Sequence, residues 1–507
     1  MKIQIYSHDI LCPPLLLELQ KEGADVLLSE KEKSKTLEGT IKRGVHKNPD
    51  LVIFDDVGFK DEPVEMRKKG IPTVGGNLKS DAMELDRIKG IKIAQLMGIK
   101  TPRTESFDNF EDMIKFIKEN PARYIMKQEK LLDGIKGMNF ASKKDDSSDL
   151  LERIEWLKER WVDGLVPTFV IQQFIEGREI ACGSYFNSNE FMKDKNGNEI
   201  CEENFETKPL CAGDLGQATG EMYTLLRYRL ASESLLFKET LDKAREVLTK
   251  IGFIGDVDAN CIVNKEGVWI LEWTMRFGSP ASSGQIAIHK TKWSEFLLAM
   301  AKGEQVDFEY DPRWTIIAWI VTPPFPYAEG DKIKNLIEEK YKKNPPKNTD
   351  EKKDLLESRL MDSLDVVLDF KEQPTKEELE NIHPEYVYYK NGKIRLANSG
   401  GYGITVSGQG ETVKEAGEKT EKLLKKILLP SRLWRNDFGA HYFESRKDLI
   451  KWGYLQDDST IEEQLAEKAK QEEKDKQTKE IEDRFKKDYE GKLKEVKDAV
   501  RGVIYGK

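Results

Sequence analysis

The sequence predicts a multidomain chain of α/β and α+β structure that begins with a doubly wound parallel sheet. Three observations predict this class. A length of 507 residues exceeds what one ordinary hydrophobic core supports. Strand and helix signals alternate over residues 1–75, and an antiparallel hairpin pattern covers 253–275. We expect an N-terminal α/β domain at 1–80, a central domain at 81–330 with a subdomain at about 121–190, a β-rich domain at 331–455 and a charged helical tail at 456–507.

The N-terminal segment repeats a strand–helix alternation. The expected strands are 2–6, 24–28, 50–54 and 71–74, and the expected helices are 14–22 and 62–69. The run DLVIF at 50–54 is continuously apolar, as in strands buried on both faces of a parallel sheet. A helical pattern then covers 80–97 and ends at Gly98, which suits a helix C-cap.

The middle of the chain predicts mixed structure. We expect a strand at 124–127, a glycine-containing loop at 133–137, a helix at 150–162 and a strand at 168–174. Strands at 253–263 and 268–275 are joined by the turn NKEG. Residues 331–353 are rich in Lys, Asn and Pro and suggest a domain boundary, with later strands at 366–370, 386–389, 393–397 and 402–407.

The last fifty residues are dominated by Lys and Glu and carry an apolar stripe at helical spacing. The stripe consists of Ile481, Phe485, Tyr489, Leu493, Val496 and Val500. Such a stripe packs on the protein itself or on a sister chain, which would give a homo-oligomer. A docking helix for another partner is the alternative.

Composition excludes several classes of function. The formal net charge is -9 with both signs mixed along the chain, which argues against a nucleic-acid partner. Five cysteines without a CxxC pair indicate reduced thiols, and hence a cytoplasmic protein. The N-terminal apolar stretch is broken at 12–14 by Cys-Pro-Pro, unlike a signal peptide, and no apolar run has the length of about 20 residues that a membrane helix needs. Small molecules are the expected partners.

The predicted hairpin carries the most informative polar residues. Asp256, Asp258 and Asn260 share one face of its first strand, because strand side chains alternate. On the second strand, Glu272, Thr274 and Arg276 share one face. Oxygen ligands beside a guanidinium suit Mg²⁺ and a transferring phosphoryl group. The alternative is a solvated face whose charges pair across the strands.

The segment LEWTMRFGSP at 271–280 resembles the E-F-N-x-R-F-G-D-P signature of phosphoribosylamine–glycine ligase (glycinamide ribonucleotide synthetase), an ATP-grasp family. Further segments resemble that family in the same order. They are the passage at 50–102, YIMKQEKLLDGIKGM, FVIQQFIEGREIA, KPLCAGDLGQATGEM, and the C-terminal SGGYGITVSGQGETVKEAGEK with RNDFGAHYF. Six matches in one order over about 400 residues make the fold signal specific.

The resemblance implies an ATP site. It places Arg87 and Lys127 on the phosphates, and Lys136 and Gly137 in the small loop that closes over them. Adenine would be read by the hinge, and the ribose hydroxyls by Glu179. The hinge residues are Gln172, Gln173, Phe174 and Ile175.

The resemblance also implies the remaining roles. Asn260, Glu272 and Thr274 would bind Mg²⁺, for which Mn²⁺ could substitute, and Arg276 would be the catalytic residue that stabilises the transferred phosphoryl group. The substrates would contact Lys208, Asp214, Thr219, Gly220 and Ser279. The implied chemistry is phosphoryl transfer to a carboxylate, followed by amine attack on the acyl phosphate. Such chemistry depends on positioning and charge neutralisation rather than on a nucleophilic side chain.

The departures from the family concern its substrate motifs. The N-terminal G-x-G-G-R-E-H loop is replaced by SHDILCPP, whose Pro13 and Pro14 donate no N–H to an anion. Asp55 and Asp56 follow a strand where a sugar phosphate would be repelled and an amine attracted. G-D-P-E becomes GSPA at 278–281, and Thr274 replaces an asparagine.

Three functions remain open at this point. The first is a carboxylate–amine ligase with an altered amine. The second is a true phosphoribosylamine–glycine ligase of purine biosynthesis, which the C-terminal resemblance favours. The third is a non-catalytic nucleotide-binding or scaffold protein, which Thr274 and Asn260 at metal positions favour.

Overall fold

The structure is a computed structural model that describes residues 1–129, 138–162, 164–327, 330–360 and 363–457. Residues 458–507 of the charged tail, with its apolar stripe, and the glycine-containing loop at 133–137 therefore fall outside the described residues, as do Lys136 and Gly137 of that loop. No helix in the described ranges is both long and apolar enough to cross a bilayer.

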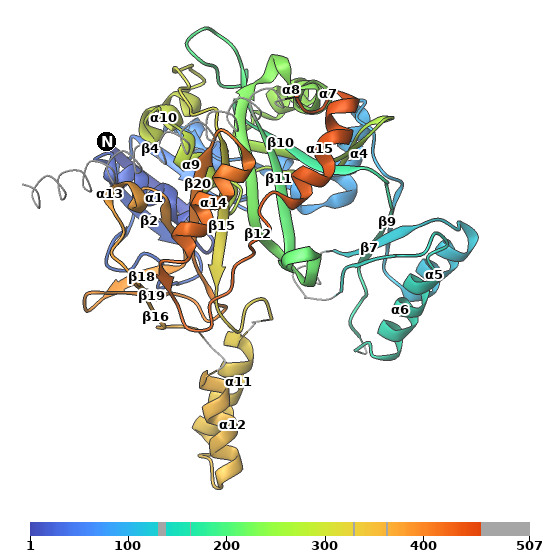
Figure 1. The fold of residues 1–507 in the computed structure, drawn as a ribbon, viewed down its shortest axis with the longest axis vertical. Coiled ribbons are helices and arrows are strands. Elements are labelled where there is room, and N and C mark those ends of the chain that lie inside the picture. The colour runs from blue at the N-terminus through green and yellow to red at the C-terminus, as the bar shows by residue number, and fades with distance from the viewer. Residues whose placement is uncertain (130–137, 163, 328–329, 361–362, 458–507) are drawn as a thin grey trace, which may run out of the picture. The chain divides into compact units, whose positions relative to one another are not determined.

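The N-terminal sheet is parallel, as predicted. Its strand order is β3-β2-β1-β4-β5, and the two helices α1 and α2 connect its strands. Figure 1 labels α1, β2 and β4 of this unit. The elements are β1 (Lys2–Ser7), α1 (Pro13–Lys21), β2 (Asp25–Glu30), β3 (Lys42–Arg43), β4 (Leu51–Phe54), α2 (Glu62–Lys68) and β5 (Thr73–Val74). Apolar side chains of β1, β2 and α1 pack with those of α10 (Trp293–Lys302) in one buried core.

The single helix predicted at 80–97 is wrong, because the chain forms two helices there. These are α3 (Leu78–Leu85) and α4 (Arg87–Leu96). Asp86 between them is extended, with φ -121° and ψ 93°, and its side chain accepts a hydrogen bond from the Lys89 amide. An aspartate that caps a helix in this way starts a new helix rather than continuing the old one. Arg87 consequently lies at the first position of α4.

A small α+β unit follows with its own hydrophobic core. Its sheet has the order β6-β9-β7-β8, and α5 and α6 pack against each other beside it (Figure 1). The bounds are β6 (Thr104–Phe107), α5 (Phe110–Glu119), β7 (Tyr124–Gln128), β8 (Phe140–Ala141), α6 (Ser148–Glu159) and β9 (Phe169–Gln173). Its core includes Phe110, Met113, Ile154 and Phe169 and is separate from the core of the N-terminal sheet.

The central sheet has the order β14-β13-β10-β11-β12-β15-β20-β17. Its strands are β10 (Arg178–Asn187), β11 (Ile200–Cys211), β12 (Leu215–Leu230), β13 (Ile254–Asn264), β14 (Gly267–Thr274), β15 (Trp314–Val321), β17 (Ile382–Pro384) and β20 (Tyr402–Gly410). The associated helices are α7 (Leu235–Glu239), α8 (Leu241–Ile251), α9 (Ala281–Ile288), α10, α14 (Val413–Leu424) and α15 (Ala440–Trp452). The predicted hairpin at 253–275 is confirmed as β13 and β14.

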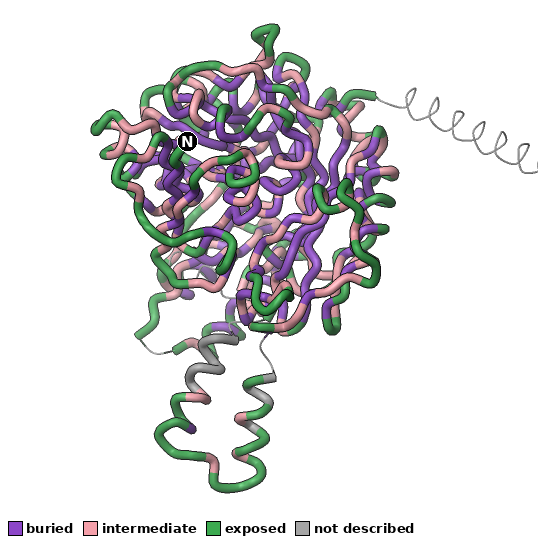
Figure 2. Tube along the Cα trace, turned by 90° about the vertical axis from the view of Figure 1, so that its left-hand side faces the viewer, coloured by how far each residue is buried: buried purple, intermediate pink, exposed green. Residues whose placement is uncertain are grey.

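The region after residue 330 differs in part from expectation. The suggested boundary at 331–353 contains two helices, α11 (Gly330–Lys343) and α12 (Thr349–Leu360), which pack against each other and carry mostly exposed residues where side chains are described (Figure 2). The expected β-rich structure is present, but β20 pairs with β15 and so extends the central sheet. The remaining elements are β16 (Val367–Phe370), α13 (Lys376–Leu379), β18 (Val387–Lys390), β19 (Lys393–Leu396) and β21 (Ile427–Leu428).

Candidate active site

Glu272 on β14 lies among three cations that come from different parts of the chain. Arg87 Nη1 at the start of α4 is 2.5 Å from Glu272 Oε2. Lys208 Nζ on β11 is 4.0 Å from Glu272 Oε1. Lys127 on β7 is close enough for its charge to act on the Glu272 carboxylate. The fold therefore brings together four charged residues that are separated by up to 185 positions in the sequence.

The electrostatics of this group keep Glu272 ionised. Burial alone would raise the pKa of Glu272, but Arg87, Lys208 and Lys127 hold that pKa well below its usual range. Burial lowers the pKa of Lys127 to about 8, despite the nearby Glu272. A half-buried lysine of lowered pKa gains from an anionic ligand, because a phosphate would compensate its lost hydration.

Lys208 is held by two further carboxylates. Its Nζ is 2.8 Å from Glu206 Oε2 and 3.6 Å from Glu179 Oε1. Burial lowers the pKa of Lys208, but Glu206, Glu179 and Glu272 together raise it well above its usual value. Glu179, expected to contact ribose, thus joins the same charged group.

The register of the hairpin places the expected metal ligands side by side. Asn260 pairs with Glu272, and Asp258 pairs with Thr274. Asn260 is 4% exposed and its Nδ2 donates to Glu206 Oε1 at 3.3 Å. Its Oδ1 is buried with no hydrogen-bond partner in the described part of the chain. An unsatisfied amide oxygen opposite an ionised carboxylate fits a divalent cation.

The alternative of a solvated hairpin face with cross-strand ion pairs is not supported. Asn260 is buried, and the ion-pair partners of Glu272 lie on α4 and β11 rather than on β13. Within the described ranges, no three His, Cys, Asp or Glu side chains are placed to hold a metal ion by themselves. A Mg²⁺ at Asn260 and Glu272 would therefore need phosphate oxygens as further ligands, which is how this ion is usually held.

The expected hinge consists of the last two residues of β9, Gln172 and Gln173, and the two residues that follow. The amides of Gln173 and Phe174 donate to Arg103 O and Arg123 O, both at 2.8 Å, and the buried Gln172 donates to Thr104 Oγ1 at 3.2 Å. Ile175 lies in no helix or strand, and its amide makes no backbone hydrogen bond to any described residue.

A cavity of about 620 Å³ adjoins this hinge. Phe174 and Ile175 line it together with residues from β13, β14 and α15, namely Asn264, Trp269 and Trp452. The hinge thus offers one backbone donor beside a cavity with aromatic walls.

Arg276, expected beside the phosphates, pairs with acids near the N-terminal sheet. Its Nε is 3.1 Å from Glu84 Oε1 and 3.8 Å from Asp56 Oδ1. Burial lowers the pKa of Arg276, but Glu84 and Asp56 raise it above its usual value. Met275 N also donates to Glu84 Oε2 at 2.6 Å, which fixes the backbone that presents this arginine.

The expected substrate residues divide into two places. Thr219 Oγ1 donates to Lys208 O at 2.7 Å, so these two lie together, with Gly220 next to them on β12. Asp214 instead pairs with Arg435 at 2.8 Å and His441 at 3.0 Å. Ser279 is half-buried and follows Arg276 by three residues.

The N-terminal loop encloses a carboxylate. Asp55 is fully buried, and its Oδ2 accepts from Ser7 Oγ at 2.9 Å and from Leu11 N at 3.0 Å. Burial raises the pKa of Asp55 to about 7. The Ser7 hydroxyl and the Leu11 amide, which precede α1, therefore already donate to Asp55. This agrees with the sequence difference noted above, in which SHDILCPP stands where the family has its phosphate-binding loop.

The sequence reasoning missed the acidic residues of β11. Glu202, Asn204 and Glu206 alternate along this strand with Lys208, so all face the hairpin residues Asp258 and Asn260. The signal was present, because E-x-N-x-E-x-K is a period-2 pattern.

Comparison with known proteins finds relatives in sequence and in fold. Residues 91–282 match the family model of the phosphoribosylglycinamide synthetase ATP-grasp (A) domain. Phosphoribosylamine–glycine ligase of Caldanaerobacter subterraneus is 20% identical over 397 residues, covering 75% of this chain and 81% of that protein. The chloroplastic enzyme of Arabidopsis thaliana is 21% identical over 395 residues, covering 74% of this chain and 64% of that protein.

Solved structures share the fold. The structure of phosphoribosylamine–glycine ligase from Thermotoga maritima covers 86% of this chain and 100% of its own, with a TM-score of 0.60 and 16% identity. The biotin carboxylase domain of a 2-oxoglutarate carboxylase from Hydrogenobacter thermophilus, solved with MgADP and bicarbonate, covers 85% and 91%, with a TM-score of 0.54 and 12% identity.

Proposed function

We propose that this chain, an ATP-grasp protein that resembles phosphoribosylamine–glycine ligase, is an ATP-dependent carboxylate–amine ligase that acts through an acyl phosphate. The observation that carries the proposal is the convergence of Arg87, Lys127 and Lys208 on Glu272. Three cations and one ionised acid form the charge pattern that a magnesium triphosphate needs.

Each charged residue has a part in this mechanism. Arg87 and Lys127 bind phosphate oxygens, which would take the place of the Glu272 carboxylate as their partner. Glu272 and Asn260 supply oxygens to Mg²⁺, with Thr274 next along β14, and the ion when bound neutralises phosphate charge.

The backbone of the hinge supports a position for adenine beside Ile175. Ile175 N is the donor that the hinge leaves for adenine, whereas the amides of Gln173 and Phe174 are already used. Glu179 lies within 3.6 Å of Lys208 and so connects the expected ribose position to the phosphate group.

The carboxylate substrate belongs between Lys208 and Arg276. Lys208 attracts its negative charge, and Arg276 stabilises the charge that develops during phosphoryl transfer. The Glu84 carboxylate and the Met275 amide fix the position of Arg276. Phosphate, ADP and a new C–N bond are the products.

An altered amine is favoured over phosphoribosylamine. The donors that precede α1 serve the buried Asp55, and Pro13 and Pro14 at the start of that helix have no N–H to offer a phosphate. Asp56 lies beside Arg276 and would repel a sugar phosphate. A true phosphoribosylamine–glycine ligase is the second candidate, supported by the matched domain at 91–282.

The test is ADP release by the full chain with ATP and Mg²⁺ across a panel of amino acids, with and without simple amines. Release that needs both an acid and an amine supports the ligase. Turnover with glycine only when phosphoribosylamine is present selects the second candidate. ATP binding without turnover under any condition would indicate a non-catalytic protein and contradict the proposal.

A further inference from the structure

The pairing of β11 with β12 is irregular beside Lys208. On β11, Lys208 alone separates the two pairs that flank the irregularity, whereas residues 219–222 of β12 separate the same two pairs. This bulge contains Thr219 and Gly220, two of the expected substrate residues. β-Bulges are frequent next to active sites, because they change the direction in which a side chain points. The irregularity therefore affects how Lys208 is presented to Glu272.

Beyond the bulge, β11 and β12 end in a hairpin that we call the β11–β12 tip, which consists of residues 209–218. Every residue of the tip is exposed or half-buried, and its turn at 213–216 is exposed. A segment that buries so little of its own surface depends on contacts with other segments for a fixed position. Lys208 and Thr219 stand at the base of the tip, so a displaced tip would displace both.

Arg435, which lies between β21 and α15, donates to this tip. Its side chain carries a charge and is 1% exposed. Nη1 donates to Pro209 O at 3.2 Å, one residue from Lys208, and Nη2 is 2.8 Å from Asp214 Oδ1. Asp437 accepts from Nε at 2.6 Å and from Nη2 at 2.9 Å, which fixes the plane of the guanidinium. A rigid group with five donors can hold several acceptors in place at once.

Asp437 makes a second connection, which spans the bulge. Its Oδ2 accepts from Gly213 N in the tip at 3.0 Å. Its backbone oxygen accepts from Tyr223 Oη at 3.1 Å, where the regular ladder of β11 and β12 resumes. His441 Nε2 adds a contact of 3.0 Å with Asp214 Oδ2. Residues 435–441 thus contact the chain on both sides of the bulge.

Stability alone does not explain a buried arginine at this place. Burial of a charged side chain costs hydration, and ion pairs at buried sites often only offset that cost. The contact with Pro209 has a more specific effect, because it supplies a donor to the backbone next to the bulge. The segment RNDFGAHYF resembles the family, yet the charged group around Glu272 contains none of its residues.

We propose that Arg435 is a positioning residue of the active site. Together with Asp437, it fixes the β11–β12 tip and thereby the bulge that presents Lys208 to Glu272 and to the nucleotide phosphates. Arg435 binds acceptors of the protein and acts on the nucleotide only through Lys208. The inference rests on the proposed ligase function and adds a residue to the site that this function uses.

The test is a double-mutant cycle on MgATP binding by the full chain, measured by calorimetry. Lys208→Met should raise the dissociation constant about tenfold, because a charged phosphate contact is lost. Arg435→Met should raise it about 3–10-fold. The double variant should match Lys208→Met within about twofold, since a residue that acts through Lys208 has no effect once Lys208 is gone.

Three results of this cycle would overturn the proposal. They are effects that multiply in the double variant, an Arg435→Met variant that binds MgATP like the wild type, and a Lys208→Met variant that does so. If Arg435→Met does not fold, Asp214→Asn takes its place in the cycle, because the Asp214 side chain is 50% exposed. It should weaken MgATP binding about 2–3-fold, and only when Lys208 is present.

Arg435→Lys distinguishes a fixed tip from a nearby charge. Lysine keeps the charge but not the planar fork that reaches Pro209, Asp214 and Asp437. MgATP binding by Arg435→Lys should therefore stay closer to that of Arg435→Met than to that of the wild type. Full binding by Arg435→Lys would mean that the charge alone matters and would contradict the positioning role.

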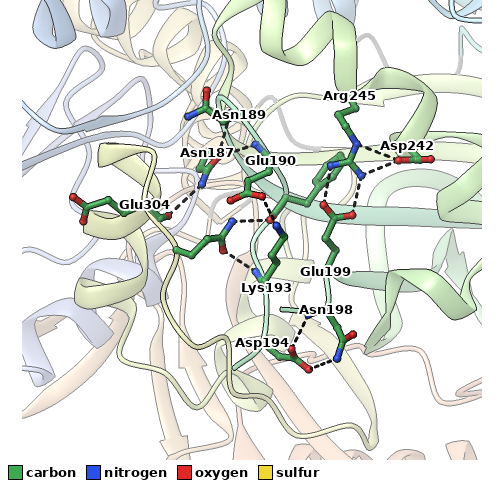
Figure 3. Close-up of polar contacts among 12 residues, drawn as sticks. Asn187, Asn189, Glu190, Lys193, Asp194, Asn198, Glu199, Asp242, Arg245 and Glu304 are labelled. Carbon is green, nitrogen blue, oxygen red and sulfur yellow. Dashed lines mark hydrogen bonds and ion pairs between the residues drawn. The ribbon is translucent and has the colours of Figure 1, made fainter. Parts of the chain in front are cut away.

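The matched control is Arg245→Met. Arg245 also binds two carboxylates, those of Glu199 and Asp242, each at 2.8 Å (Figure 3). Glu199 precedes β11, whereas Lys208 lies near the other end of that strand. Arg245→Met should lower the denaturant midpoint and leave MgATP binding within about twofold of wild type. An equal loss of MgATP binding in Arg245→Met and Arg435→Met would show that Arg435 acts only through stability.

MgATP binding by the wild-type chain separates this inference from the function on which it rests. If the wild type does not bind MgATP, the ligase proposal fails. If the wild type binds MgATP and Lys208→Met weakens that binding while Arg435→Met does not, the positioning inference fails and the ligase proposal stands.

Discussion

The two ends of the candidate active site differ in how charge is balanced. At the phosphate end, Glu272 is paired with Arg87 and Lys208, so opposite charges neutralise one another. At the other end, on β13, Asp256 and Asp258 lie near each other with raised pKa values. The phosphate end is therefore stable without a ligand and exchanges partners on binding. The carboxyls of Asp256 and Asp258 instead keep their protons to a higher pH than usual, because two ionised carboxylates there would repel each other.

The largest expected effect is at Glu272. Glu272→Gln removes the charged ligand of Mg²⁺ and the partner of Arg87, so ADP release should fall about 10²–10³-fold. Glu246→Gln, an exposed change on α8, is the control and should leave the rate unchanged. A Glu272→Gln enzyme within tenfold of wild type would show that this residue is not in the reaction.

Lys127 comes next. Lys127→Met removes a half-buried charge that we assign to a phosphate contact, so the dissociation constant of MgATP should rise about 10–100-fold. Calorimetry measures this constant directly. Lys144→Met, an exposed lysine of the same small unit, should have no effect. If Lys127→Met and Lys144→Met bind MgATP with the same dissociation constant, Lys127 does not contact the nucleotide.

Asp256 on β13 should show the opposite behaviour, because its carboxylate lowers the stability of the folded chain. Asp256→Asn removes a buried acid with like-charged neighbours and should raise the free energy of unfolding of the ligand-free chain by about 1–3 kcal/mol at pH 8. Denaturant unfolding measures it. A loss of stability in this variant would mean that the carboxylate is paired in the folded protein.

The pH dependence of stability follows from the same residue. The folded pKa of Asp256 is about 8 and its ordinary value is 3.8, so between these values the folded state binds more protons than the unfolded state. Stability should therefore fall as pH rises from about 4 to about 8. The fall should be smaller in Asp256→Asn. Parallel pH profiles for the variant and the wild type would contradict the assignment.

The smallest effect is proton uptake at the phosphate end. Because the pKa of Lys127 is about 8 and a phosphate would raise it, MgATP binding at about pH 8.5 should take up a fraction of one proton. Calorimetry in two buffers of different ionisation enthalpy detects this uptake. Lys127→Arg should abolish it, because arginine stays protonated at this pH.

The hairpin could be predicted from the sequence because alternation alone decides which residues share a face. Asn260 and Glu272 are in fact paired in register. The parallel N-terminal sheet followed in the same way from its strand–helix alternation. These patterns are local, and local patterns are what a single sequence carries.

The remaining features depend on contacts between distant segments. Nothing near Arg276 in the sequence shows that Glu84 holds it, and nothing near Asp214 shows its pairing with Arg435. The break at Asp86 was missed because apolar spacing continues across it, whereas the capping bond that starts α4 depends on conformation. Alternation in the sequence predicts that the acids of β11 share one face of the strand. Their proximity to Asp258 could not be predicted, because it depends on the pairing of β10 with both β11 and β13.

The most direct test is a double-mutant cycle on MgATP binding with Lys127→Met, Glu272→Gln and the double variant. If the two residues serve one triphosphate–magnesium site, their effects are not additive, and the coupling free energy should be about 1 kcal/mol or more. Additive effects, or binding that neither variant changes, would show that Lys127 and Glu272 do not share a nucleotide.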